Sequence, residues 1–159
     1  MGVKMSKEKL SKKNWFIITL FCFMGGIEVD KYGNVNAHRG PGAFAGVGGF
    51  ANITAKTKTV VFCLTFNAKG LNVDEKDDRI TIINEGSIPK FVDEVTSISF
   101  SAKRARANKQ RILYVTERCV FELGEHGLRL IEVYPGVDME NDILNQLPFK
   151  VEVDSLLQY

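Results

Sequence analysis

Apolar residues cluster into short runs whose lengths and spacing are typical of β-strands. The longest run, residues 59–66, is nearly continuous in β-branched and apolar side chains, which is the pattern of a strand buried on both faces. Three shorter runs follow at residues 112–115, 119–123 and 128–133. The last two flank Gly-Glu-His-Gly at 124–127, which predicts a tight turn. The chain is therefore expected to consist mainly of strands.

A β-hairpin and one half-exposed strand are predicted between these runs. Residues 71–73 and 80–83 flank the acidic stretch 74–78, as the two strands of a hairpin flank their turn. The acidic stretch lacks the glycine and the terminal glutamate of a calcium loop. We therefore expect a solvated turn there and not a metal site. Residues 95–100 alternate between apolar and polar, which predicts a half-exposed strand.

Helical signals are few. Asp138 is suited to cap a short helix that Pro148 would end. The apolar face of this helix would consist of Met139, Ile143, Leu144 and Leu147.

The N-terminal region combines a lysine-rich stretch with a short apolar run at residues 15–24. That run is shorter than the ~20 residues needed to cross a bilayer, so a membrane span is not expected. The main interpretation is a core-facing strand or helix behind a loose basic tail. A signal-like segment, a myristoylated N-terminus and an N-terminus altered by truncation or a reading-frame change stay open as alternatives.

Residues 25–53 hold more than half of the chain's 14 glycines. Glycine gives up side-chain burial but permits positive φ and a close approach of the backbone to another group. One interpretation is a pair of tight turns between strands. The other is a cradle in which backbone N–H groups face a phosphate or an oxyanion. Gly46, Gly48 and Ala51 also fit a dinucleotide fingerprint, but that motif must follow a strand and open a helix, and neither is expected here.

Four stretches of the sequence resemble the family I coenzyme A transferases, and more narrowly the acetate, propionate or acetoacetate CoA-transferases. They are residues 28–36 (EVDKYGNVN), 46–50 (GVGGF), 58–62 (KTVVF) and 113–121 (LYVTERCVF). The resemblance extends from about Gly25 to about Phe149. It corresponds to the last part of the family's β domain.

The resemblance implies an α/β fold: a strand-rich, partial NagB/RpiA/CoA-transferase-like domain with hairpins and a short C-terminal helix. It divides the chain into a basic tail plus apolar segment at 1–24, the CoA-transferase part at 25–150, and a tail at 151–159. The sheet partners that precede this part in the family have no counterpart here. We therefore expect self-association, or a partner that carries the missing half.

The resemblance also implies a ping-pong reaction on acyl-CoA and carboxylic acid substrates. In the family a glutamate attacks an acyl-CoA thioester and becomes a glutamyl-CoA intermediate. The family's glycine loop corresponds to Gly46, Val47, Gly48 and Gly49, and its N–H groups bind the developing oxyanion. The family's catalytic glutamate precedes the position of Gly25, so no catalytic residue is assigned in this chain. Glu28 and Glu85 lie in the wrong places to be that glutamate.

Composition and charge exclude some classes of function. The net charge is +2, yet the first 14 residues carry five lysines and one glutamate, so the remainder is slightly acidic. A nucleic-acid-binding domain needs a concentrated basic face, and nucleic acid is therefore not an expected partner. The most basic run, residues 103–111, is interpreted as a solvated connection, with CoA phosphates or a neighbouring subunit as alternative contacts.

The three cysteines, Cys22, Cys63 and Cys119, are expected to be free thiols in a reducing cytoplasm, with Cys63 and Cys119 buried in strands. His38 and His126 are expected to lie solvated at turns. With no paired cysteines, neither a zinc site nor any other metal site is expected. Coenzyme A is expected as a thioester substrate and not as a permanently bound cofactor.

Three functional hypotheses follow. The chain is part of an active transferase whose glutamate comes from elsewhere, a non-catalytic remnant, or an interaction module on the same scaffold. In every case we expect the chain alone to show no CoA-transferase turnover.

Overall fold

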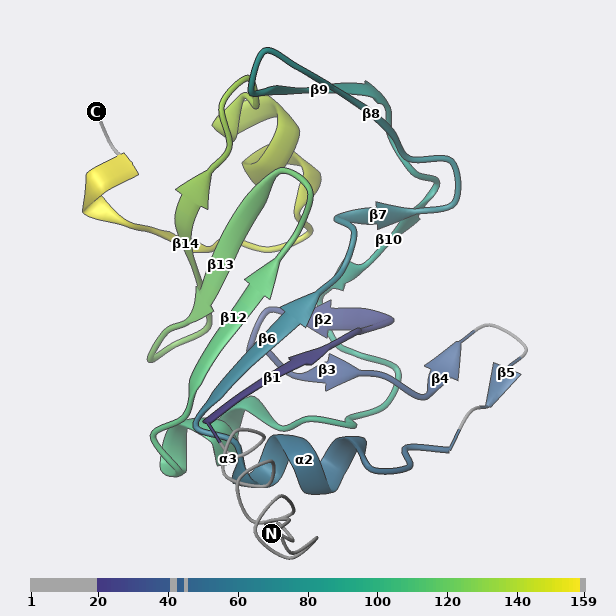
Figure 1. The fold of residues 1–159 in the computed structure, drawn as a ribbon, viewed down its shortest axis with the longest axis vertical. Coiled ribbons are helices and arrows are strands. Elements are labelled where there is room, and N and C mark those ends of the chain that lie inside the picture. Colours follow the sequence, from purple (N-terminus) through teal and green to yellow (C-terminus); the bar gives the residue numbers. More distant parts are fainter. Residues whose placement is uncertain (1–19, 41–42, 45, 158–159) are drawn as a thin grey trace, which may run out of the picture.

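The computed structural model describes residues 20–40, 43–44 and 46–157. Its largest sheet has six strands in the order β1-β6-β12-β13-β14-β15 (Figure 1). These strands are β1 (Phe21–Met24), β6 (Thr59–Cys63), β12 (Arg111–Val115), β13 (Cys119–Leu123), β14 (Leu128–Val133) and β15 (Glu152–Val153). The first three run parallel, β12 to β14 form an antiparallel meander, and β15 is parallel to β14. The strands expected from the apolar runs are thus confirmed, and the fold is the predicted strand-rich α/β class.

The central strand β6 is buried on both faces, as its continuous apolar sequence predicts. Val60 and Phe62 are fully buried on one face, and Val61 is buried on the other. The expectation that Cys63 is buried is wrong: it is exposed at the end of β6. The neighbouring strand β1 ends at Met24, opposite Phe62, so it does not extend alongside Cys63.

An aromatic cluster fills the inner face of the sheet. The ring of Phe62 lies 5.5 Å from that of Tyr114, 5.1 Å from that of Phe100 and 6.1 Å from that of Phe50. Such pairs contribute about 0.5–1.5 kcal/mol each beyond their buried area. The cluster therefore joins this face of the sheet to the segments that carry Phe50 and Phe100.

Two short helices lie side by side at the lower end of the sheet (Figure 1). In α2 (Phe50–Lys56), Phe50 and Thr54 are buried, and they lie one turn apart on one face. In α3 (Ala102–Ala107), Ala102 and Ala105 are buried behind the N-cap Ser101. The predicted connection at 103–111 is solvated, since Lys103, Arg104, Lys109 and Arg111 are exposed, but it is largely helical, because it contains most of α3 and the first residue of β12.

A small sheet of β11 (Phe91–Val92), β2 (Glu28–Asp30) and β3 (Val35–Asn36) packs against the inner face. The turn between β2 and β3 is held by buried Asp30, whose carboxylate accepts from the N–H groups of Tyr32 and Asn34 at 3.0 and 2.9 Å. The hydroxyl of Tyr114 donates to the carbonyl of Gly33 at 2.5 Å. Residues 28–36, the first of the stretches that resemble the CoA-transferases, thus form a turn that is fixed to strand β12 of the main sheet.

The predicted strand at residues 95–100 is not formed. Only Phe100 makes a bridge, to Val35. Side-chain hydrogen bonds take the place of a ladder, since Thr96 bonds to Glu28 and Ser99 accepts from the N–H of Ala37 at 2.8 Å. Serine and threonine compete in this way with regular secondary structure.

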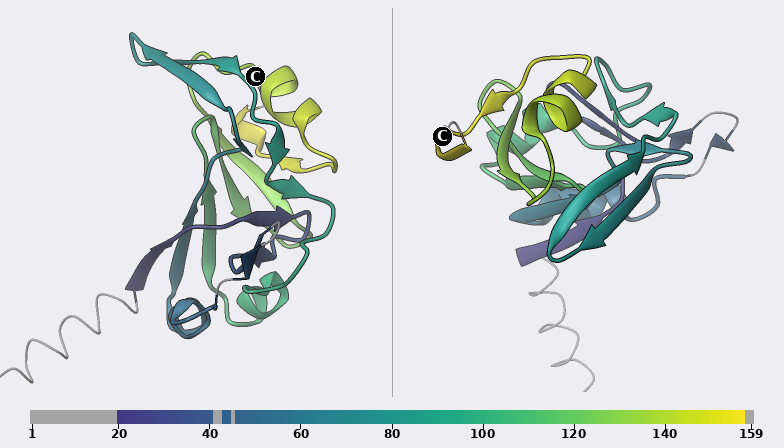
Figure 2. Two further views of the ribbon diagram at one scale, coloured as in Figure 1. Left: turned by 90° about the vertical axis from the view of Figure 1, so that its right-hand side faces the viewer. Right: turned by 90° about the horizontal axis from the view of Figure 1, so that it is seen from above.

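The predicted hairpin is confirmed, with longer strands. It consists of β8 (Asn72–Lys76) and β9 (Arg79–Asn84), and Asp77 and Asp78 form the turn with φ of 53° and 59°. A two-residue turn with both φ positive matches the twist of a hairpin. This hairpin extends the pair β7 (Asn67–Ala68) and β10 (Ile88–Pro89) into an arm that projects from the body (Figure 2). A further small pair is β4 (Arg39–Gly40) with β5 (Ala43–Phe44).

The predicted C-terminal helix is confirmed as a π-helical turn, η1 (Met139–Ile143), followed by a 3-10 turn, η2 (Leu144–Gln146). Asp138 caps it by accepting from the N–H groups of Glu140 and Asn141 at 3.0 and 2.9 Å. Ile143 is fully buried. A last 3-10 turn, η3 (Ser155–Leu157), follows β15.

The apolar run at 15–24 contributes the edge strand β1, while residues 15–19 lie outside the described part of the chain. Cys22 points into the core, whereas Phe21 and Phe23 are 57% and 71% exposed. Among the described residues, no helix has the length and apolarity needed to span a membrane.

Replacing Gly33 with alanine is expected to destabilise the fold by roughly 2–4 kcal/mol. Gly33 has φ of +88°, and an added Cβ would lie 2.5 Å from Cδ1 of Leu123 and 2.7 Å from the hydroxyl of Tyr114. Gly25→Ala is the matched control, because a Cβ there meets nothing within 4 Å. Urea unfolding of both variants measures the difference, and equal midpoints would contradict the proposed close packing of the turn.

Candidate functional site

The glycine loop consists of residues 46–49 and leads directly into α2. Gly46, Gly48 and Gly49 are exposed, while Val47 is half-buried against the core. Gly48 has φ of +49°, in the left-handed region that favours glycine. Within the described part of the chain, the N–H groups of these four residues donate to no carbonyl; the first amide so bonded is that of Phe50, to the carbonyl of Val47 at 3.0 Å. The loop thus presents backbone donors to solvent.

The expectation that no helix follows the loop is wrong. Ile53 and Thr54, two β-branched residues soon after the loop, both lie in α2. The hydroxyl of Thr54 donates to the carbonyl of Phe50 at 2.8 Å, which lets a buried polar side chain fit the helix interior. The strand before the loop, β5, is only two residues long. The loop therefore lies between a short hairpin and a short helix and not in a strand–turn–helix unit of the dinucleotide-binding kind.

Both ends of α2 are fixed to the core. At its start, the buried ring of Phe50 contacts that of Phe62. At its end, the side-chain amide of Gln110 donates to the carbonyls of Thr54 and Thr57 at 2.7 and 2.6 Å. These contacts determine where the glycine loop lies, because the loop's own glycines have no side chains to anchor it.

The buried side chain of Asn36 holds the segment between β3 and β4 through hydrogen bonds to its backbone. Its amide nitrogen donates to Glu28 at 2.9 Å and to the carbonyl of Arg39 at 2.7 Å. Its amide oxygen accepts from the N–H groups of His38 and Arg39 at 3.2 and 3.0 Å. The carboxylate of Glu28 also accepts from the N–H and hydroxyl of Thr96. Glu28 is therefore engaged in structural hydrogen bonds.

His38 is half-buried and not solvated as predicted. Its Nδ1 lies 2.6 Å from the hydroxyl oxygen of Ser99, and its Nε2 lies 3.3 Å from that of Ser97. Ser99 also accepts from the N–H of Ala37. The imidazole thus links the segment after β3 to the segment before α3.

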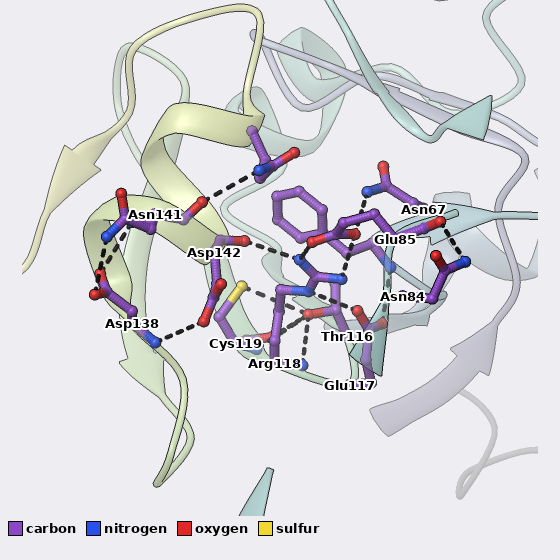
Figure 3. A network of polar contacts seen from close by, with 12 residues as sticks. Asn67, Asn84, Glu85, Thr116, Glu117, Arg118, Cys119, Asp138, Asn141 and Asp142 are labelled. Atoms are coloured by element: carbon purple, nitrogen blue, oxygen red, sulfur yellow. Dashed lines mark hydrogen bonds and ion pairs between the residues drawn. The ribbon is translucent and has the colours of Figure 1, made fainter. Parts of the chain in front are cut away.

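A second polar cluster surrounds Arg118, just beyond the carboxyl end of β12 (Figure 3). The Arg118 side chain is fully buried and pairs with Glu85 at 2.7 Å and with Glu117 at 2.7 Å. It also donates to the carbonyl of Asp142 at 2.9 Å and lies 4.5 Å from the centre of the Phe66 ring. The cluster joins the arm, the meander and η1.

Glu85 is thus committed to an ion pair. Arg118 donates to both of its carboxylate oxygens, and Asn67 donates to one of them at 2.7 Å. The hydrogen bonds from Arg118 hold the pKa of Glu85 below its ordinary value, against the opposing effect of burial. A carboxylate held in this way is a weak nucleophile.

Two of the three cysteines, Cys22 and Cys119, have a raised pKa, so neither thiol is activated as a nucleophile. Burial raises the pKa of Cys119 to about 12 and raises that of Cys22 above its ordinary value. All three cysteines are free, and Cys119 is buried as predicted. Among the described residues, no group of three or more His, Cys, Asp or Glu is placed to hold a metal ion.

The sequence and the fold are similar to those of known CoA-transferases. Acetate CoA-transferase YdiF of Escherichia coli K12 is 42% identical over 128 residues, which cover 80% of this chain and 24% of that protein. Caffeate CoA-transferase of Acetobacterium woodii is 41% identical over 140 residues, which cover 85% of this chain and 26% of that protein. The chain matches no protein-family model.

Solved structures give the same result. The acyl-CoA transferase YdiF apoenzyme of Escherichia coli O157:H7 superposes with a TM-score of 0.83 at 40% identity, over 85% of this chain and 26% of that one. Its thioester complex with CoA superposes with a TM-score of 0.82. The homologues are thus CoA-transferases, and the chain spans about a quarter of their length.

Glu85→Gln is expected to destabilise the protein by about 2–3 kcal/mol, because it leaves fully buried Arg118 without one of its two carboxylates. Asp93→Asn, in the exposed ion pair with Lys31, is the control and is expected to leave stability almost unchanged, because solvent screens exposed pairs.

The difference between wild type and Glu85→Gln depends on pH. A lowered folded-state pKa means that Glu85 stabilises the fold above its unfolded pKa and loses that effect as pH falls through its folded pKa. Urea unfolding between about pH 7 and about pH 3 should show the two free energies converging in acid. A constant difference would show that the Glu85–Arg118 charge pairing is not the cause.

Proposed function

We propose that this chain is part of a family I CoA-transferase, which moves coenzyme A between short-chain carboxylic acids through a glutamyl-CoA intermediate. The observation that carries the proposal is the 40–42% identity to CoA-transferases together with the TM-score of 0.83. Acyl-CoA and a carboxylic acid are the substrates, and coenzyme A is carried as a thioester and not as a resident cofactor.

The glycine loop is proposed as the element of this chain that faces the reacting group. Its N–H groups are exposed and bonded to no carbonyl of the described residues. Donors of this kind stabilise negative charge that develops on a thioester or anhydride oxygen, because they need no reorganisation during the reaction. The anchored Phe50 keeps those donors in a fixed position.

The nucleophilic glutamate is proposed to come from outside these 159 residues. Glu28 accepts hydrogen bonds from Asn36 and Thr96, and Glu85 is paired with Arg118. Neither carboxylate adjoins the glycine loop in sequence, and each has a structural function of its own. In this proposal, the chain supplies the oxyanion loop and part of the substrate-binding surface.

Gly48→Ala is expected to weaken binding of acetyl-CoA, because a left-handed φ costs an alanine about 1–2 kcal/mol and the loop must shift. Gly46→Ala is the matched control, since a Cβ at either position meets nothing within 4 Å but only Gly48 has a positive φ. Isothermal titration with acetyl-CoA compares the two. Equal affinities would show that the loop conformation does not contribute to binding.

The purified chain alone is expected to show no exchange of CoA between acetyl-CoA and a second acid, since the resemblance places the family's catalytic glutamate before the position of Gly25 and assigns none within the matched part of this chain. Borohydride trapping of a glutamyl thioester, followed by mass spectrometry, provides the measurement. Robust exchange that is abolished by Glu28→Gln or Glu85→Gln would place the nucleophile in this chain and refute the proposal.

A second candidate, an interaction module built on the same scaffold, is favoured by the free edge of β1. That edge is unpaired in the described sheet and carries exposed Phe21 and Phe23. Unprotected edges with apolar side chains invite pairing with another chain.

We expect the isolated chain to self-associate through this edge, and Phe23→Lys to reduce the association, because a charged side chain protects an exposed edge. Size-exclusion chromatography with light scattering measures the mass. A wild-type monomer with a cooperative thermal transition would show that the edge needs no partner.

A further inference from the structure

The end of the molecule at which β6 and β12 begin is strongly basic. It contains α2 and α3 and the residues that join them to these strands (Figure 1). Residues 50–60 include two lysines and residues 101–111 include five lysines or arginines, and neither segment has an aspartate or a glutamate. Lys58 and Lys109 lie together, since both line one hollow at the carboxyl ends of the two helices. Four exposed side chains of these segments form a surface that we call the basic end: Lys58, Lys103, Arg104 and Lys109.

The positive charge of the basic end is not neutralised within the described part of the chain. None of its four side chains has a carboxylate of the described residues within ion-pair distance. The neighbouring basic residues are already engaged, since Arg106 donates to two backbone carbonyls at 2.7 and 2.9 Å and Arg111 pairs with Glu122 at 3.0 Å. The four side chains are therefore available to an anionic surface outside the chain.

The opposite end of the molecule is acidic. The hairpin of β8 and β9 carries four exposed carboxylates against two basic side chains, and its arm lies at the far end of the main sheet from α2 and α3 (Figure 1). The charge is thus polarised along the molecule, which orients it in the field of a charged surface. A negatively charged surface attracts the basic end and repels the four carboxylates, which are those of Asp74, Glu75, Asp77 and Asp78.

Exposed apolar side chains adjoin the basic end. Phe21 is 57% exposed at the start of β1, and its strand partner on β6 is the residue that follows Lys58. Ile98 is 58% exposed and lines a hollow together with Arg104. In the sequence, Phe21 belongs to the apolar run at 15–24, which follows the lysine-rich stretch. Basic and apolar side chains are thus neighbours both along the chain and in the fold.

We propose that the basic end binds the surface of an anionic lipid bilayer, where Phe21 and the apolar residues before it anchor the protein at the boundary between headgroups and acyl chains. Each lysine or arginine close to an anionic leaflet adds attraction, which falls off within a Debye length. Apolar side chains add burial that salt does not screen, so the two contributions together strengthen peripheral binding. A nucleic acid would use the cations but would leave the exposed side chains of Phe21 and Ile98 in water.

The test measures binding of the full chain to lipid vesicles by cosedimentation. One set of vesicles contains phosphatidylserine and phosphatidylcholine in equal parts, and the other contains phosphatidylcholine alone. The glutamine variant of the basic end combines Lys58→Gln, Lys103→Gln and Lys109→Gln, and an arginine variant replaces the same three lysines with arginine. The control makes the same change in net charge at three exposed basic residues of the arm, as Lys69→Gln, Lys76→Gln and Arg79→Gln.

Wild type is expected to bind the anionic vesicles and not the neutral ones. The glutamine variant should lose about ten-fold in affinity for the anionic vesicles, because three attractive charges are removed. The arginine variant keeps those charges and the control changes an arm that faces away from the bilayer, so both should bind like wild type. Raising the ionic strength should weaken wild-type binding. Trp15 is the chain's one tryptophan, and its emission should shift to the blue as the apolar run enters the bilayer.

Equal affinities of the glutamine variant and the control would overturn the proposal, and so would equal binding of wild type to neutral and anionic vesicles. An unshifted tryptophan emission would overturn the anchoring by the apolar run. If double-stranded DNA binds wild type as tightly as the anionic vesicles do and leaves the emission unchanged, the basic end is a nucleic-acid surface and the lipid proposal fails. None of these outcomes affects the transferase proposal.

Discussion

The ring of Phe62 is the contact on which most of the structure depends. It lies on the central strand of the sheet and packs against Tyr114 of the next strand, Phe100 before α3, and Phe50 at the start of α2. Four separate segments of the chain thus meet around one side chain. The glycine loop has no anchor of its own except Val47, so its position follows from where Phe62 places Phe50. The loop gains a defined position in this way while its glycines stay exposed.

Many residues that stand out in the sequence act through hydrogen bonds inside the fold. Asp30 and Asn36 are buried and satisfy backbone groups of adjoining turns, and Arg118 lies among two carboxylates and a carbonyl. Buried polar groups need such partners, because an unpaired one costs about 1–3 kcal/mol. The likeness of these residues to the CoA-transferase family is therefore explained by the fold they stabilise. The exposed glycine loop differs, because its N–H groups bond to no carbonyl of the described residues.

Strands were predictable from the sequence because burial on two faces leaves an unambiguous apolar run. Residues 59–63 and the meander of β12 to β14 are of this kind. The helices α2 and α3 were not predictable, because each spans two turns or fewer and buries only two side chains. Residues 95–100 alternate like a strand, but the hydroxyls of Thr96 and Ser99 bond to distant partners, and no local pattern reveals such partners. The glycine loop could be located from its composition, whereas Glu85 and Arg118 lie on separate segments and come together only through the fold.

The parallel pairing of β1, β6 and β12 has a consequence for the order in which the chain folds. Each of these pairings joins strands that are separated by dozens of residues, whereas β8 with β9 and β13 with β14 join neighbours across short turns. Closing a long loop must precede any gain from the contacts it permits, so parallel sheets form slowly. The two hairpins can form early, but Phe62 acquires its neighbours only when β6 docks beside β12. Until that step, the most apolar strand of the protein lacks both its flanking strands and is the segment most exposed to aggregation on the ribosome.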